Sequence, residues 1–329
     1  MDHGVAVTWY GWLGFAVLVV SQALLPWRLE PLAGWFTPIM WSAYILAADA
    51  LVLRRRGASL IHDHPREAAF MATVSIPLWL VFELYNWRLA NWDYFGVPDP
   101  VWLAALGYAW AFATITPGLF ETAALLAAAG AFARSRGPGR LPAPRLLAAA
   151  VGVGAAFLVG PPLLPAAIRP WTFGFVWLGF VLLLDPLNYR AGRPSFTAAW
   201  ARGDHGFVYR WLVAGLVCGF LWEFWNYWAT GKWQYVGVPV FPSVKLFEMP
   251  LVGYLGFPPF ALEAFAMYHF VRPLGGFPAP SRSFPEQRGG RDDRDHEARE
   301  DSGREEGYGG RQESRGAAGG GQADGAAAG

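Results

Sequence analysis

Stretches of about 20 apolar residues recur along the chain, and they constrain its fold more than any other feature of the sequence. Each is long enough to cross the hydrocarbon core of a bilayer, which is roughly 30 Å thick. Inside that core every backbone N–H and C=O group needs a partner within the protein, and an α-helix supplies these partners locally. The sequence therefore predicts an all-α fold, a polytopic membrane helix bundle.

We expect about eight transmembrane helices, the first of them a retained helix and not a cleaved signal peptide. Their approximate ranges are residues 7–27, 35–53, 68–87, 100–133, 146–164, 171–187, 207–228 and 246–271. Pro117-Gly118 is expected to kink or break the fourth helix. Only 16% of the residues are charged and the net charge is +1. These values predict a lipid bilayer as the surroundings and argue against a nucleic-acid partner.

One sequence motif occurs in two similar copies, FELYNWRLANWDYFGVP at residues 82–98 and WEFWNYWATGKWQYVGVP at residues 222–239. Six further identities share a fixed offset of 136 residues: Pro26/Pro162, Trp35/Trp171, Trp41/Trp177, Asp49/Asp185, Arg54/Arg190 and Ser59/Ser195. We therefore expect two tandem four-helix repeats, residues 1–138 and 139–275. Because four helices return the chain to the same side, the repeats should be parallel and related by a pseudo-two-fold axis.

The remaining residues, 276–329, are rich in Gly, Ser, Arg, Glu, Asp and Ala. A segment of this composition cannot bury an apolar core, so we expect a disordered tail.

Acidic side chains within the expected membrane helices are the candidates for catalysis. Glu83 and Asn86 are three residues apart and so share a helix face, and Glu223 and Asn226 repeat this spacing. The amide could orient the carboxyl group as part of a proton-donating site. An equally open interpretation is that each pair only joins neighbouring helices.

Three further glutamates belong to the candidate catalytic set. Glu121 and Glu263 follow prolines that could free backbone carbonyls for a ligand, or the glutamates could bond to those carbonyls themselves. Glu248 has no counterpart in the first repeat. An acid at the bilayer centre costs roughly 2.5–3.5 kcal/mol, so such residues usually face a bundle interior or a cavity. A neutral acid there would donate a proton, and an ionised acid would attract a cation.

Four aromatic residues follow the Glu/Asn pairs and are the candidate substrate-binding residues: Trp92, Tyr94, Trp233 and Tyr235. Trp and Tyr are common at any membrane boundary, and a belt of this kind is one interpretation. The other is an aromatic wall around a cavity, where ring faces would stabilise positive charge. No metal-ligand spacing and no nucleotide-binding motif is found, so neither a metal nor a cofactor is expected.

The pattern W-x-Y-x-G-V-P before an apolar helix resembles the lycopene cyclase domain of the heterodimeric carotenoid cyclases. The matching residues of the second copy are Trp233, Tyr235, Gly237-Val238-Pro239 and, further on, Glu248. The P-x-E-E motif of that family is absent from both copies. The sequence is also similar to a family of bacterial polytopic membrane proteins that share KLFEMPLVGYLGFPPFALE, here residues 245–263.

The resemblance implies an isoprenoid or carotenoid cyclase in which a membrane-embedded Glu protonates an alkene of a membrane lipid and needs no cofactor. A non-catalytic membrane scaffold and a proton- or cation-coupled transporter are the alternatives. The resemblance also implies a bacterial inner membrane. Basic residues gather in alternate loops, among them Arg54, Arg134 and Arg202. The positive-inside rule then places both termini in the cytoplasm.

Overall fold

The computed structural model describes residues 6–277, so the predicted disordered tail lies outside the described residues except for Gly276 and Phe277. This range is mostly helical. Its long helices are α1 (Trp9–Leu24), α2 (Phe36–Arg56), α4 (Pro65–Leu89), α5 (Val101–Ala128), α6 (Pro144–Leu163), α7 (Phe173–Arg190), α9 (His205–Trp228) and α10 (Phe257–Val271). Its short elements are the helices α3 (Leu60–Asp63) and α8 (Phe196–Ala201), the 3₁₀ turns η1 (Leu25–Trp27), η2 (Arg169–Trp171), η3 (Leu251–Gly256) and η4 (Arg272–Gly275), and the strands β1 (Trp92–Phe95), β2 (Lys232–Tyr235), β3 (Lys245–Leu246) and β4 (Met249–Pro250).

Six of the described helices are long and apolar enough to cross a membrane: α1 with its 3₁₀ extension, α2, α4, α5, α6 and α9. This fits an integral membrane protein. The other two expected spans correspond to α7 and α10, which have 18 and 15 residues. The count of eight spans therefore stays a prediction.

The last expected span does not begin where the sequence suggested. Residues 245–256 form β3, β4 and η3, and the helix begins only at Phe257. The prediction of a helix from residue 246 is therefore wrong. Pro258 and Pro259 occupy the first turn of α10, where a missing N–H group is tolerated. They mark a helix start, and not a break inside a membrane helix.

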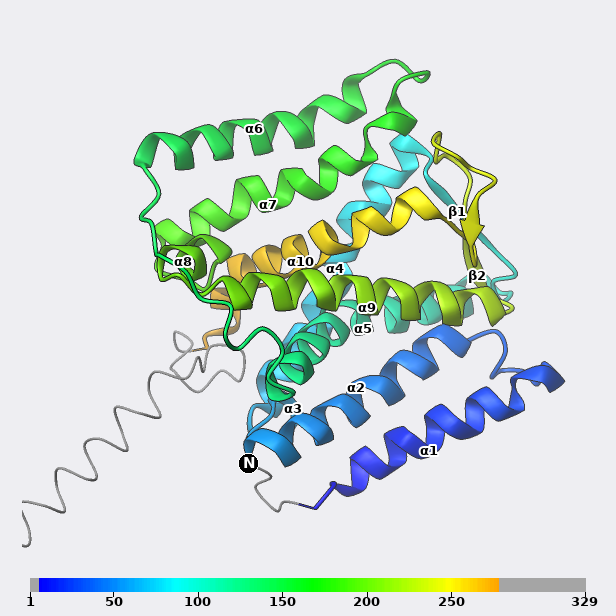
Figure 1. The fold of residues 1–329 in the computed structure, drawn as a ribbon. Coiled ribbons are helices and arrows are strands. Elements are labelled where there is room, and N and C mark those ends of the chain that lie inside the picture. The colour runs from blue at the N-terminus through cyan, green and yellow to red at the C-terminus, as the bar shows by residue number, and fades with distance from the viewer. Residues whose placement is uncertain (1–5, 278–329) are drawn as a thin grey trace, which may run out of the picture. The chain divides into compact units, whose positions relative to one another are not determined.

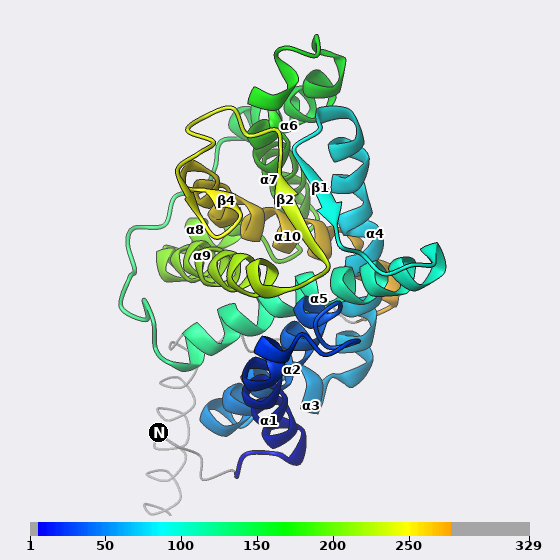
Figure 2. The same cartoon turned by 90° about the vertical axis from the view of Figure 1, so that its right-hand side faces the viewer.

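The long helices run roughly side by side, with the β1–β2 ribbon at one end and α3 and α8 at the other (Figure 1). In the view toward the ribbon, α10 lies behind it, between α4 and α9, while α1 and α6 lie on opposite outer sides (Figure 2). Buried aromatic residues from the two halves of the chain form one core. Among them are Trp41, Phe120, Trp211 and Phe265.

Helix α5 continues through Pro117, so the expected break at this proline is not observed. The side chain of Ser75 on α4 supplies hydrogen-bond partners for two backbone groups that precede this proline. The hydroxyl of Ser75 accepts a hydrogen bond from the N–H of Thr116 at 3.1 Å and donates one to the carbonyl of Phe112 at 2.6 Å. The serine thus bridges the two groups that a regular helix would pair directly.

Two buried aspartates hold the short helices at the end opposite the ribbon. Asp49 accepts hydrogen bonds from the N–H of Ile61 and the hydroxyl of Ser59. Asp185 accepts bonds from the N–H groups of Phe196 and Thr197. Each carboxylate thus fixes the first turn of the short helix that follows it, α3 or α8.

A buried ion pair ties the start of α4 to the end of α10. Arg272 donates from Nε to Oε1 of Glu67 at 2.6 Å and from a terminal nitrogen to Oε2 at 2.9 Å. The hydroxyl of Tyr268 donates to the same Oε1 at 2.8 Å. Both charged residues are only 5% exposed, so removing one partner would leave the other charge buried.

We predict that Glu67→Gln lowers the free energy of unfolding by about 3–5 kcal/mol, because the Arg272 charge then lacks its counter-ion. Tyr268→Phe removes only a hydroxyl and should cost about 1 kcal/mol. Denaturant unfolding of the purified protein in detergent micelles measures both changes. Equal losses for the two variants would contradict a stabilising ion pair.

Candidate functional site

The two copies of the repeated motif pair in a two-stranded antiparallel ribbon. Strand β1 belongs to the first copy and β2 to the second, and their register pairs Trp92 with Tyr235 and Tyr94 with Trp233. The Trp of each copy therefore lies opposite the Tyr of the other. This brings all four candidate substrate-binding residues together in one ribbon.

The asparagines of the repeated motif bind these strands to the helix ends. Asn86 donates from Nδ2 to the carbonyl of Trp92 at 2.8 Å, and its Oδ1 accepts from the N–H groups of Asn91 and Trp92. Asn226 donates to the carbonyl of Trp233 at 2.8 Å and accepts from the N–H of the same residue at 3.0 Å. The hypothesis that these amides orient the glutamates is therefore wrong, since both ends of each amide bind strand backbone.

Aromatic side chains hold the glutamates instead. Oε1 of Glu83 accepts from Nε1 of Trp79 at 2.8 Å and from the hydroxyl of Tyr94 at 2.6 Å.

The second copy repeats this arrangement at Glu223. Its Oε1 accepts from the hydroxyl of Tyr235 at 2.9 Å and from Nε1 of Trp233 at 3.3 Å. Glu223 is fully buried, and its Oε2 has no hydrogen-bond partner within residues 6–277. One carboxyl oxygen is thus held by two aromatic donors, while the other is buried without a hydrogen-bond partner in this part of the chain.

The two ribbon tyrosines act as hydrogen-bond donors. Burial, and after it the nearby carboxyl of Glu83, raises the pKa of Tyr94 well above its usual value. Burial and the carboxyl of Glu223 do the same to the pKa of Tyr235. Both phenols therefore stay protonated over the physiological range, and their O–H groups donate hydrogen bonds to the glutamate oxygens.

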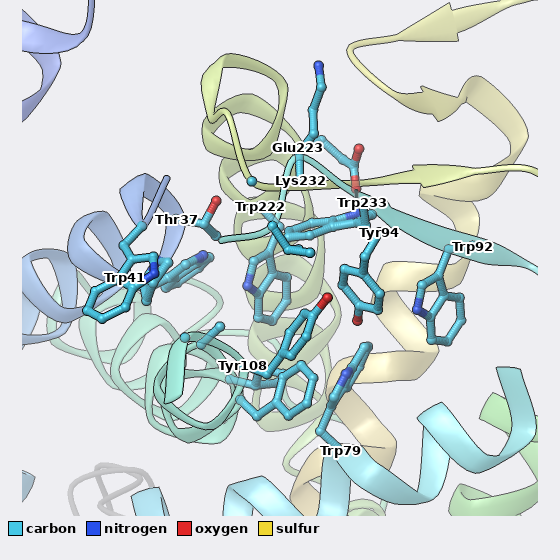
Figure 3. A pocket seen from close by; sticks show the side chains of 18 of the residues that line it. Thr37, Trp41, Trp79, Trp92, Tyr94, Tyr108, Trp222, Glu223, Lys232 and Trp233 are labelled. Carbon is cyan, nitrogen blue, oxygen red and sulfur yellow. Dashed lines mark hydrogen bonds between the residues drawn. The ribbon is translucent and has the colours of Figure 1, made fainter. Parts of the chain in front are cut away.

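A cavity lies beside the ribbon, between helices of both halves of the chain. It has a volume of about 1150 Å³, including the part that is open to the outside, and half of its lining residues are aromatic. Trp92, Tyr94, Trp233 and Tyr235 all line it, as does Glu223. Figure 3 shows the labelled rings of these and neighbouring residues around the shared space. A wall of this kind is the arrangement that binds an apolar ligand of substantial size.

The other candidate catalytic residues lie elsewhere. Glu248 accepts a hydrogen bond from Nζ of Lys232 at 2.6 Å, so this acid does have a basic partner. Glu121 on α5 and Glu263 on α10 are buried at 1% and 0% exposure but do not line the cavity. Glu83 also lies outside the lining and is linked to it through Trp79 and Tyr94, two lining residues that donate hydrogen bonds to its Oε1.

Several cavity residues were not among the sequence candidates, namely Trp41, Trp79, Tyr108, Trp222 and Lys232. Three of them carried a usable signal. Trp41 is one of the residues repeated at the offset of 136, Trp79 precedes Glu83 by four residues and so shares its helix face, and Trp222 begins the second copy of the repeated motif. Tyr108 and Lys232 are assigned to the cavity only by the packing of the chain.

No group of three or more His, Cys, Asp or Glu residues within the described range is placed to hold a metal ion. Comparison with models of protein families, with curated proteins and with solved structures finds no match. The resemblance to the carotenoid cyclases therefore stays a prediction, and function is argued from the geometry of the cavity.

We predict that Asn226→Leu lowers the free energy of unfolding by about 2–3 kcal/mol, because it removes two hydrogen bonds and leaves backbone groups of Trp233 without partners. Asp93→Asn at an exposed position of the paired strand is the control and should change stability by less than about 0.5 kcal/mol. Thermal unfolding in micelles compares the two variants. If Asn226→Leu is as stable as the control, the amide does not anchor the ribbon.

Proposed function

We propose that this integral membrane protein binds an unsaturated membrane lipid of the isoprenoid type in the aromatic cavity and isomerises it by proton transfer from Glu223. The observation that carries the proposal is the position of Glu223. It is a fully buried carboxyl group on the wall of an apolar, aromatic cavity, with one oxygen held by Tyr235 and Trp233. A positioned acid beside a bound alkene is what such a reaction requires.

The reaction would need no co-reactant. Glu223 in its neutral form gives the proton on Oε2 to one alkene carbon, whose π electrons form the new C–H bond. The neighbouring carbon becomes positive, and the π pair of a second alkene closes a ring onto it. Loss of an adjacent proton to the Glu223 carboxylate then forms a new double bond and restores the acid. The product is an isomer of the substrate.

The surroundings of Glu223 suit each of these steps. The hydroxyl of Tyr235 donates to Oε1 and so stabilises the carboxylate that forms when the proton leaves. Trp222 and Trp233 line the same cavity, and a ring face turned toward the ligand would stabilise the positive carbon. The apolar lining limits the access of water, which would otherwise trap the cation as an alcohol.

The second part of the proposal is that the two halves of the chain are parallel four-helix repeats related by a pseudo-two-fold axis. Three observations support it. The β1–β2 register places equivalent residues symmetrically, Asn86 and Asn226 make equivalent bonds, and Asp49 and Asp185 fix equivalent short helices. The site would then lie near the pseudo-axis, as in other membrane proteins built from repeats.

The third part is the orientation in a bacterial inner membrane, with both termini in the cytoplasm. Arg54 lies in the last turn of α2, and Arg134 and Arg202 follow the ends of α5 and α8. The ribbon lies at the end away from α3 and α8 (Figure 1). The positive-inside rule would then place the cavity toward the outer leaflet.

The test is a lipid comparison between cells that express the wild type and cells that express Glu223→Gln. We expect a lipid that is formed by the wild type and reduced at least 100-fold in the variant, because general acid catalysis contributes about 10²–10⁴ in rate. Since an isomerisation leaves the mass unchanged, the extracts are separated by chromatography before mass spectrometry.

Asp93→Asn is the matched control, because it removes an exposed carboxylate from the same ribbon outside the cavity. It should leave the lipid profile unchanged. Identical profiles for the wild type and Glu223→Gln, with both proteins inserted in the membrane, would contradict catalysis and favour a scaffold.

A further inference from the structure

The cavity wall contains a continuous arc of aromatic rings. Consecutive ring centroids along it are 4.7 to 6.0 Å apart. In order, the rings belong to Trp41, Trp222, Phe260, Trp79, Phe112, Tyr108 and Tyr94. Each ring carries negative charge density on its faces. A curved wall of such rings is therefore more than an apolar surface, because it attracts a positive charge that has lost its water.

The charged residues around the arc also favour a positively charged ligand. Glu223 follows Trp222 directly in the sequence and lines the same cavity. The only basic residue of the lining is Lys232, whose Nζ is 2.6 Å from Oε1 of Glu248 and 3.3 Å from the carbonyl of Tyr227. Figure 3 shows the Lys232 side chain directed away from the labelled rings. Glu223 is thus the acidic residue of the described lining, and its hydrogen bonds are to Tyr235 and Trp233, not to Lys232.

We infer that the cavity is a binding site for a lipophilic organic cation, such as an alkyl ammonium ion, with Glu223 as its counter-ion. The cationic group lies over the faces of Trp222 and its neighbours, and the alkyl chain follows the apolar wall. The inference deepens the proposed function and rests on it, because the reaction would form a positive carbon in this place. A stable ammonium ion resembles that intermediate in charge and shape, and Glu223 releases its proton to the solvent when the ion binds.

The experiment uses two ligands of the same shape that differ in charge. One is octyltrimethylammonium, and the other is the neutral alkane in which carbon replaces the nitrogen. Their binding to the purified full-length protein in non-ionic micelles is measured by titration calorimetry, with protein-free micelles as the blank. We expect the wild type to bind the ammonium ion at least tenfold more tightly, which corresponds to about 1.4 kcal/mol.

Variants assign this preference to the cavity. Glu223→Gln should weaken the binding of the ammonium ion at least tenfold and leave the binding of the alkane unchanged. Trp222→Leu should reduce the preference for the charged ligand as well, because it removes one ring of the arc. Asp93→Asn on the outer side of the ribbon should bind both ligands like the wild type.

Equal affinities of the wild type for the two ligands would overturn the inference, and so would a preference that survives Glu223→Gln. The result is separate from the lipid comparison. Charge-selective binding without any change in cellular lipids would retain the cation site and reject the proposed isomerisation. A change in lipids without charge-selective binding would retain the reaction and reject the cation site.

Discussion

The hydrogen bonds from two asparagine amides to strand backbone are the constraint on which the rest of the site depends. Asn86 and Asn226 each end a membrane helix by fixing the strand that follows it. Because both strands are fixed in this way, they can pair as an antiparallel ribbon across the two halves of the chain. The ribbon in turn places the hydroxyls of Tyr94 and Tyr235 on the two glutamates. A chain of local contacts thus positions acids that lie 140 residues apart in the sequence.

The two copies of the repeated motif differ in the contacts of their glutamates, and the packing of neighbouring side chains explains the difference. Trp79 donates to Glu83 from one helical turn away, whereas the position at the same distance before Glu223 is Gly219. A Cβ atom at Gly219 would lie 2.2 Å from the ring of Phe257, so this glycine makes room for a ring from α10. Glu83 lies outside the cavity lining, while Glu223 is part of it. The two copies thus share the Asn and Tyr contacts and differ in whether their glutamate lines the cavity.

An apolar, aromatic cavity within a membrane protein suits a ligand that arrives from the lipid phase. A buried acid in such surroundings costs free energy, and here aromatic donors offset part of that cost by binding one of its oxygens. The transport alternative depended on helices broken by proline. Helix α5 continues through Pro117, and Pro258-Pro259 begin a helix, so this argument for an ion path no longer holds. The proposed binding of a lipid at Glu223 does not depend on broken helices.

The sequence by itself determined the class of molecule, the paired glutamates and the aromatic residues that follow them. Length and apolarity decide that a segment becomes a membrane helix, and both can be read locally. The roles of Asn86, Asn226 and Glu248 could not be read in this way, because their partners are backbone groups and a lysine of the two ribbon strands. The cavity residue Tyr108 looks like any other membrane aromatic in the sequence, and the repeats that single out Trp41 and Trp222 do not tell which space these rings surround. Only the packing of helices from both halves decided which rings surround Glu223, because a cavity is a property of how side chains fail to fill the space between helices.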